Sequence, residues 1–496
     1  MSTKSITKRL LTISCVSMLL GVTAQAQFNF NGTNNSTAVA LRDPARQAST
    51  SVDAAIYNPA GTAFLEDGFH VSLNGLYSYQ SLCSYGIQDN KAVDMHHERI
   101  MNITPSIQLV WKKGDLSLSA SLADEGDMGK FTCAEGSIPY SAYFQGLSMV
   151  YGLDEIINEL NMDWLLSKAL LSLADYNETL DIALEDEYRL GTSKFAHTIH
   201  NQTARLGASY AINANLSVYA GAKLSYLTRA TSMTPQIQMY RASTFQNWEA
   251  YSYFNSKAEL LGQGTDAFEP NTELAEIFKN MANNVADVSL DAFTTNHSAI
   301  GVTPVVGVDY RLGRVNIGAK YEFQTVIDNK DWAGFKLPSN FSLGANWAIL
   351  DNLNVALGGR AFFRTNDNYG LHGDIEPNKM SGTVAASISY SPLKKLLLSI
   401  GQSYESYSGY WFLPLSEDLE IPNLYRLSTS FGCAYDITER LQLNIGSRIG
   451  YTPTHIATNM EFNIFDNGEY VNALKYPINY YTNIKYNVAL GVNYRF

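Results

Sequence analysis

The C-terminal stretch "TNIKYNVALGVNYRF" (482–496) decides the fold class, because its side chains alternate between two chemical types. One face is apolar or aromatic and holds Ile484, Tyr486, Val488, Leu490, Val492, Tyr494 and Phe496. The other face is small, polar or basic and holds Lys485, Asn487, Ala489, Gly491, Asn493 and Arg495. A period of two predicts a β-strand with one apolar face. Soluble β-sandwiches and membrane barrels both contain such strands.

The same alternation recurs upstream, in "LQLNIGSRIGY" (441–451) and "VNIGAKYEF" (315–323). The polar face of these stretches consists mainly of Gly, Asn and Ser with a single basic residue. A sandwich would carry scattered surface charge there, whereas small polar residues suit the crowded lumen of a barrel. The 31 Tyr against 6 Trp, together with 35 Gly, favour the barrel as well.

The connections separate the two interpretations further. Six are short and share one pattern, an aromatic residue, a tight turn and then Leu or Val. Their aromatic residues are Trp111, Tyr210, Tyr310, Trp347, Tyr390 and Tyr435. Seven longer connections lie between them, at 81–98, 124–196, 233–296, 325–339, 365–379, 405–422 and 452–479. Thirteen connections predict an all-β membrane protein, a 14-stranded antiparallel transmembrane β-barrel with both termini on the short-turn side and an aromatic girdle there.

Residues 1–26 are expected to be a cleaved signal peptide. Three basic residues, the apolar run "LLTISCVSMLLGVT" and an A-Q-A cleavage site at 24–26 follow one another. The apolar run is too short to span a bilayer as a stable anchor. Losing the three basic residues takes the net charge from −12 to −15. This acidity argues against nucleic acid as a partner.

Three cysteines remain after the signal peptide, and their spacing suits neither a metal site nor a disulfide scaffold. Cys83 and Cys133 fall in expected outer connections, where an oxidising export route would permit them to pair. Cys433 is expected to face lipid, in alternation with Phe431 and Tyr435. We expect no cofactor.

Residues 27–68 precede the barrel (69–496) and are expected to form a small hatch that plugs its lumen. The stretch "DAAIYNPAGTAFLEDG" (53–68) is rich in small residues and follows no sustained period. A 14-stranded barrel is too wide for wall side chains alone to fill. A compact segment of this size therefore fits inside.

Two long connections carry helical patterns, at 153–176 and 271–288. Apolar residues recur at helical spacing in both, as is typical of helices that bury one face. The sequence therefore predicts helical extracellular loops. On the outer rim these helices either pack on each other or leave an apolar groove.

This layout resembles the FadL-type outer-membrane transporters of long-chain fatty acids and other hydrophobic compounds. The hatch motif D-x-x-x-x-N-P-A is present as Asp53, Asn58, Pro59 and Ala60. The strand count, the helical loops, a "GFK" segment and the C-terminus add to the resemblance. It implies passive uptake across the outer membrane, with the hatch as gate and lateral release through a kink in the third strand. It also implies outer-membrane lipid and the barrel assembly machinery as partners, and a monomer.

The lateral opening is expected near Pro105, Gly126 and Gly129. The third strand, "DLSLSASLA" (115–123), is short and ends at the acidic run 124–127. Pro105 in the second strand donates no ladder hydrogen bond. The acidic run departs from the glycine-rich stretch that the family leads us to expect. A short strand at an ordinary loop boundary, with Pro105 at a bulge, is the plain alternative.

Lys336 and Arg205 are the candidate ligand-binding residues for the carboxylate of a fatty acid. Lys336 ends "GFK", which resembles a family segment whose lysine contacts ligand, and Arg205 faces the lumen by parity. The other inward basic residues are Lys223, Lys320, Arg360 and Arg448. Alternatively, these residues pair with lumen carboxylates such as Glu322 and Asp309.

No catalytic residues are expected, because the sequence contains neither G-x-S-x-G nor H-E-x-x-H. Two functions other than transport remain open. The chain could be a structural or adhesive outer-membrane barrel, or a barrel lipid hydrolase that assembles Ser and His from neighbouring strands. A hydrophobic ligand that co-purifies with the protein would favour transport, and lipid hydrolysis by the pure protein would favour the enzyme.

Overall fold

The computed structural model describes most of the chain after residue 36. The described residues are 37–88, 91–125, 129–133, 165, 168–169, 186–190, 194–234, 237–241, 246–288, 293–327, 337–363, 380–408, 423–451, 455–466 and 469–496. The expected signal peptide, the hatch boundary at residue 27, Gly126 and Lys336 lie outside them. Among the helices of the described ranges, none is long and apolar enough to cross a membrane.

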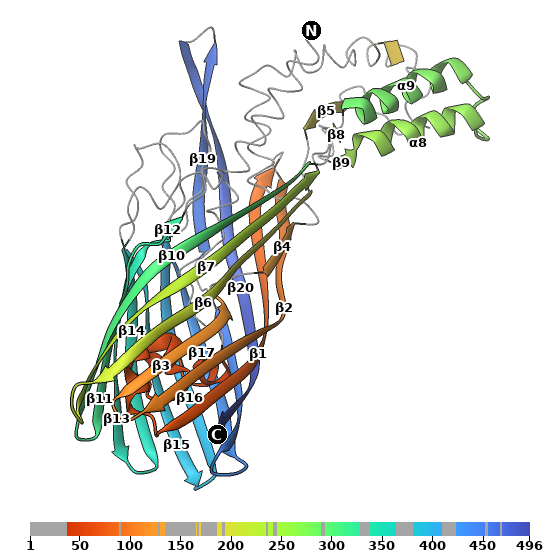
Figure 1. Ribbon diagram of the computed structural model, residues 1–496. Coiled ribbons are helices and arrows are strands. Elements are labelled where there is room, and N and C mark those ends of the chain that lie inside the picture. Colours follow the sequence, from red (N-terminus) through yellow and green to blue (C-terminus); the bar gives the residue numbers. More distant parts are fainter. Residues whose placement is uncertain are drawn as a thin grey trace.

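A closed antiparallel β-sheet forms the body of the molecule (Figure 1). The first strand pairs with the second and with the last, which closes the barrel and leaves no open edge. The sheet has 17 strand segments, and three strands consist of two segments each, so the wall contains 14 strands. The predicted fold class and strand count are confirmed.

The wall strands follow the order of the chain, with the two-segment strands given as pairs. They are β1 (Gly68–Gln88), β2 (Lys91–Lys113), β3 (Leu116–Asp124) with β4 (Gly129–Cys133), β6 (Lys194–Ala211), β7 (Leu216–Thr234), β10 (Phe293–Leu312), β11 (Val315–Glu322) with β12 (Val326–Ile327), β13 (Ser339–Leu350), β14 (Leu353–Phe363), β15 (Met380–Leu393), β16 (Leu396–Ser408), β17 (Asn423–Asp436), β18 (Leu441–Tyr451) with β19 (His455–Asp466), and β20 (Glu469–Arg495).

The two faces of the wall differ in the way the alternation predicts. Outward side chains such as Leu206 and Leu490 are 59% and 61% exposed, and inward ones such as Ser209 and Thr303 are buried. Large apolar side chains on the outside and small polar ones on the inside are what a lipid-facing wall with a filled lumen needs. The aromatic residue before each short turn is exposed as well: Trp111, Tyr210, Tyr310, Trp347, Tyr390 and Tyr435.

Two of the expected connections are mostly strand. β1 reaches Gln88 and β2 begins at Lys91, so both continue through much of 81–98. Likewise, β19 and β20 fill most of 452–479 and pair with each other there. These extensions carry many polar residues, although 455–466 still alternates, with Ile456, Met460, Phe462 and Ile464 at even positions.

The cysteine prediction is corrected accordingly. Cys83 lies in β1 and Cys133 in β4, and β2 runs between these strands and pairs with both. Two strand spacings amount to about 10 Å, which is beyond the Cα separation of about 7 Å that a disulfide tolerates. Cys433 is a free, half-buried residue of β17, and it alternates with exposed Phe431 and Tyr435 on the outward face.

A helical hairpin projects from the end of the barrel opposite the C-terminus (Figure 1). It consists of α8 (Ala250–Gln263) and α9 (Thr272–Val288). Phe254, Leu261, Phe278 and Met281 form a buried apolar core between the two helices. The predicted helix at 271–288 therefore packs its stripe against α8, which the sequence pattern did not single out. Leu165 and Ala169, from the predicted helix at 153–176, belong to the same core, and most of that helix lies outside the described residues. A three-stranded sheet of β5 (Asp186–Leu190), β8 (Ile237–Arg241) and β9 (Gln246–Glu249) adjoins the hairpin.

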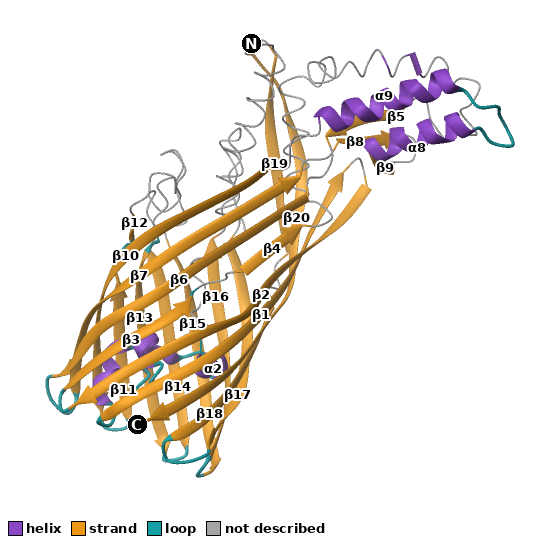
Figure 2. Cartoon of the chain, turned by 45° about the vertical axis from the view of Figure 1, so that its right-hand side comes forward, coloured by secondary structure: helices purple, strands orange, loops and turns teal. Residues whose placement is uncertain are grey.

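Residues 37–67, called the N-terminal segment below, lie inside the barrel near the end that holds the C-terminus (Figure 2). The segment consists of the short helices α2 (Ala38–Arg42), η1 (Arg46–Ala48), α3 (Ala54–Tyr57) and η2 (Pro59–Phe64). Almost all of its residues from 37 to 63 are buried. Its many alanines let the backbone approach the wall closely, which explains the lack of any periodic apolar pattern.

Candidate functional site

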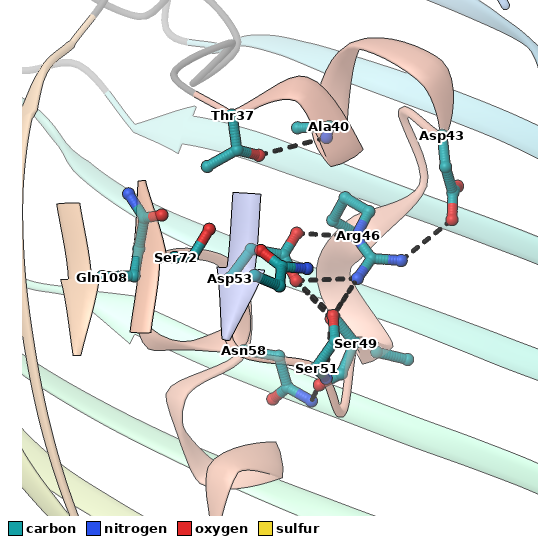
Figure 3. Close-up of polar contacts among 12 residues, drawn as sticks. Thr37, Ala40, Asp43, Arg46, Ser49, Ser51, Asp53, Asn58, Ser72 and Gln108 are labelled. Carbon is teal, nitrogen blue, oxygen red and sulfur yellow. Dashed lines mark hydrogen bonds and ion pairs between the residues drawn. The ribbon is translucent and has the colours of Figure 1, made fainter. Parts of the chain in front are cut away.

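An ionic cluster fixes the shape of the N-terminal segment (Figure 3). The guanidinium of Arg46 pairs with Asp53 at 2.8 Å and with Asp43 at 2.9 Å, and all three residues are buried. The hydroxyls of Ser49 and Ser51 donate hydrogen bonds to the Asp53 carboxylate and accept hydrogen bonds from Arg46. Burial alone would raise the pKa of the Asp53 carboxyl, but Arg46 and the two serines outweigh burial and lower it. We call these five residues the segment cluster.

The residues of the hatch motif hold a turn and attach it to the wall. The backbone N–H of Asn58 closes α3 on the Ala54 carbonyl at 2.9 Å, and Pro59 begins η2, where its fixed φ suits a first helical turn. The Asn58 side chain donates to the Ser49 carbonyl at 2.9 Å and to the Asp309 carboxylate on β10. The motif therefore joins the two halves of the segment to one wall strand.

The carbonyls of this turn accept hydrogen bonds from neighbouring wall strands. Ser209 on β6 donates to the Pro59 carbonyl at 2.7 Å, and Ser217 on β7 donates to the Ala60 carbonyl at 2.8 Å. A Cβ added at Gly318 of β11 would overlap the backbone of the segment, which explains one of the glycines on the inward face. The inner surface of the wall is therefore complementary in shape and hydrogen bonding to the N-terminal segment.

A second ionic cluster lies in the lumen on the wall strands β6, β7, β11 and β14. Its centre is Glu322 of β11, which is fully buried. Lys223 Nζ lies 2.7 Å and Lys320 Nζ 2.8 Å from its carboxylate oxygens. Arg205 and Arg360 each approach the same carboxylate to 3.4 Å. Four cations therefore surround one carboxylate.

A second carboxylate, Glu125, joins this group directly after β3 ends. Its carboxylate contacts the Arg205 guanidinium and lies 3.9 Å from Lys223 Nζ. Thr203 of β6 donates a hydrogen bond to it at 3.0 Å. We call Arg205, Lys223, Lys320, Arg360, Glu125 and Glu322 the luminal cluster.

The luminal cluster carries more positive than negative charge, since four basic residues face two carboxylates. The side chains are all at most 10% exposed. The Nε atom of Arg205 is buried, and no group of the described chain accepts a hydrogen bond from it. Excess buried charge is costly unless a counterion balances it. The arrangement therefore suits an anionic ligand group.

One lysine links the luminal cluster to the N-terminal segment. Lys320 Nζ pairs with Glu322 and also donates to the Ile56 carbonyl of α3 at 2.8 Å. Only the Lys320 side chain therefore separates Glu322 of the luminal cluster from the backbone of the N-terminal segment.

The third wall strand is interrupted beside the luminal cluster. Its pairing with β2 runs up to Leu122, opposite Ile107, and resumes at Lys130, opposite Ile100. On its other side, β6 stays paired up to Asp124 and again from Gly129. Ala123, Asp124 and Glu125 therefore have no ladder partner on β2, although Ala123 and Asp124 are paired to β6.

The structure places the predicted site residues as follows. Arg205 belongs to the luminal cluster, together with Lys223, Lys320 and Arg360, and Glu322 is their shared partner. Asp309, which the alternative interpretation named as a partner for these basic residues, accepts hydrogen bonds from Asn58 and Asn316. Arg448 lies apart from the cluster, 3.5 Å from Glu405.

Two of the three residues predicted for the lateral opening, Pro105 and Gly129, lie at the interruption, and Gly126 is outside the described residues. Pro105 is an exposed residue of β2, opposite Gly75 of β1, within the part of β2 that no described residue of the third strand pairs with. Gly129 is the first residue of β4. The sequence reading missed Glu125, which it took as one member of an acidic run. Only its position directly after the third strand could have singled it out.

A polar cavity of about 250 Å³ lies between the N-terminal segment and the wall strands β13 to β20. Arg42, Asp43, Ser387 and Gln442 are among its lining residues. Such a lining suits water or polar groups rather than an acyl chain. No group of three His, Cys, Asp or Glu that could hold a metal ion occurs in the described ranges.

Comparison with known proteins gives matches among solved structures. No family model matches the chain, and no curated protein matches it. A Pseudomonas aeruginosa FadL homologue is 12% identical over 94% of this chain and 100% of that one, with a TM-score of 0.53. A mutant of TodX, a monoaromatic hydrocarbon channel, is 13% identical over 93% of this chain and 99% of that one, with a TM-score of 0.50. The resemblance to FadL-type barrels is therefore confirmed at the level of the fold.

Proposed function

We propose that this protein takes up long-chain fatty acids, or other hydrophobic small molecules with an acidic head group, across the outer membrane. The observation that carries the proposal is the luminal cluster, with its excess positive charge between the N-terminal segment and the interrupted third strand. The FadL-type fold places the chain among barrels whose solved members include hydrocarbon channels. The fold favours a hydrophobic cargo, and the charge of the luminal cluster favours an acidic head group on it.

A fatty acid poses two physical problems that this arrangement addresses. Exposing its tail to water costs about 0.8 kcal/mol of free energy per methylene. Placing its carboxylate in apolar surroundings without a partner is also costly. In our proposal the carboxylate binds Arg205 and its neighbours in the luminal cluster. The tail then leaves sideways, between β2 and the third strand, where Pro105 and Gly129 lie. Lateral release keeps the tail out of water and requires no energy source.

The N-terminal segment acts as the gate in this proposal. Asp53, Asn58, Pro59 and Ala60 hold the turn that attaches the segment to the wall. Lys320 connects the head-group site to that segment through the Ile56 carbonyl. A carboxylate at the cluster competes for Lys320 and thereby loosens the segment. Lys336, which lies outside the described residues, is proposed as a second ligand contact on the basis of its "GFK" context alone.

Uptake of radiolabelled oleate tests the transport function. Cells that lack their own fatty-acid transporter should take up oleate when they express this chain and should not with an empty vector. Arg205→Met should lower oleate uptake by about tenfold, because a charge-assisted hydrogen bond contributes about 1.5–3 kcal/mol. Arg314→Met is the matched control, since Arg314 pairs with Asp351 on an exposed turn. Equal oleate uptake by Arg205→Met and Arg314→Met would refute the head-group site.

Deleting residues 53–62 tests the gate. The closed ladders of the wall do not depend on the N-terminal segment, so the deletion variant should keep the heat-modifiable migration of a folded barrel on gels. Its oleate uptake should differ from that of the intact chain. Unchanged uptake would show that the segment merely fills the lumen, and loss of the folded barrel would show that it is structural.

A further inference from the structure

We propose that Glu125 occupies the head-group site of the ligand-free protein, and that a carboxylate amphiphile binds by exchanging with it. The ligand class is a molecule with one carboxylate and a long apolar tail. This inference rests on the proposed function, because it assumes that the luminal cluster binds the head group.

Glu125 already makes the contacts that a ligand carboxylate would make. It is 4% exposed, contacts Arg205 and accepts a hydrogen bond from Thr203 at 3.0 Å. Its second oxygen lies 3.9 Å from Lys223 Nζ. A carboxyl group with two cations and a hydroxyl around it is a complete carboxylate-binding arrangement, supplied here by the chain itself.

Exchange of one carboxylate for another avoids a large cost in a buried site. Removing Glu125 with nothing in its place would leave Arg205 and Lys223 with less compensation in surroundings of low dielectric. An incoming carboxylate restores the same charge at the same donors. A neutral hydrocarbon brings no such compensation, so it cannot displace Glu125.

Of the two carboxylates in the cluster, Glu125 is the one that can leave. Glu322 contacts four cations, and its strand pairs on both sides, with Val305 of β10 and Asn340 of β13. Glu125 contacts two cations, and its backbone N–H bonds to Asn201 on the β6 side. On the β2 side the ladder has already ended at Leu122.

The exchange would couple recognition of the head group to the interruption of the third strand. While Glu125 contacts Arg205 of β6 and Lys223 of β7, it ties the end of β3 to these two strands. When a ligand carboxylate replaces it, that side-chain tie is lost. Anionic amphiphiles would therefore release the third strand beside the proposed exit, and neutral molecules would not.

Binding of cis-parinaric acid and of its methyl ester to the full-length protein in detergent tests the exchange by fluorescence titration. Glu125→Gln keeps the shape but removes the competing charge, so it should tighten binding of the acid by about tenfold and leave the ester unchanged. Glu125→Asp keeps the charge but shortens the side chain by one methylene, which draws its carboxylate away from Arg205 and Lys223, so it should tighten binding of the acid by a few-fold. Because Glu125→Asp changes no charge, it separates exchange from a general rise in positive potential.

Glu405→Gln is the matched control, since Glu405 is a buried lumen carboxylate that pairs with Arg426 and Arg448 elsewhere. It should change neither affinity. Acid binding that is unchanged or weaker in Glu125→Gln, or that stays unchanged in Glu125→Asp, would overturn the exchange. If the acid still binds more tightly than the ester and needs Arg205, the proposed function stands even then. Equal binding of acid and ester by every variant would overturn both.

Discussion

Two of the buried ionic clusters in the described part of the lumen differ in how completely their charges are satisfied. In the segment cluster, all three nitrogens of Arg46 donate to Asp43, Asp53, Ser49 or Ser51. In the luminal cluster, the described chain offers no acceptor for the buried Nε of Arg205, and cations outnumber carboxylates. The first cluster has its charges and donors matched by the chain itself, and the second keeps excess positive charge and an unused donor.

Our proposal of a binding role for the luminal cluster rests on this difference. Both clusters contain arginine and carboxylates that are almost inaccessible to solvent. Burial and ion pairing alone therefore do not single out a candidate site. The charge balance and the unused donor distinguish the luminal cluster from the segment cluster.

The largest expected effect concerns the segment cluster. Arg46→Met leaves Asp53 buried without its counterion, and breaking a buried pair in this way costs about 3–5 kcal/mol. We expect the N-terminal segment to lose its order while the barrel stays closed. Hydrogen exchange of peptides from residues 37–64, read by mass spectrometry, should show strongly reduced protection.

Arg314→Met serves as the control for this prediction. Its partner Asp351 is 95% exposed, and exposed ion pairs contribute about 0–1 kcal/mol. Exchange in the segment should be unaffected. If Arg46→Met leaves the segment as well protected as in the unaltered chain, the segment cluster is not what holds it together.

The smallest expected effect concerns the interruption of the third strand. Pro105→Val gives β2 a further N–H, which allows its ladder to extend into the interruption. One hydrogen bond contributes about 1 kcal/mol net, so oleate uptake should slow by a few-fold. Pro304→Val is the matched control, because Pro304 of β10 lies opposite Ala222 of β7, away from β2 and the third strand. A rate equal to that of this control would argue against lateral release at β2.

The wall could be predicted from the sequence because its pattern is local. Each strand such as 482–496 places alternate side chains in lipid and in the lumen, and each short turn follows an exposed aromatic residue such as Tyr310. The strand extension at 455–466 keeps the same alternation, with Ile456, Met460, Phe462 and Ile464 at even positions, so its period alone would have predicted a strand there.

The candidate site could be predicted only in part. The alternation along each strand predicted that Arg205 and Lys320 face the lumen. Their shared partner Glu322 could not be predicted, because it depends on how strands distant in sequence align in the barrel. Glu125 lies 80 residues before Arg205, and its acidic surroundings are typical of a solvated loop. The pairing follows only because β3 and β6 are neighbours in the barrel.

A crystal structure of the protein with bound oleate tests the central claim most directly. The account predicts the oleate carboxylate within hydrogen-bonding distance of Arg205 and Lys223, with Glu125 displaced from both. An oleate carboxylate bound away from the luminal cluster, with Glu125 still in contact with Arg205, would contradict it.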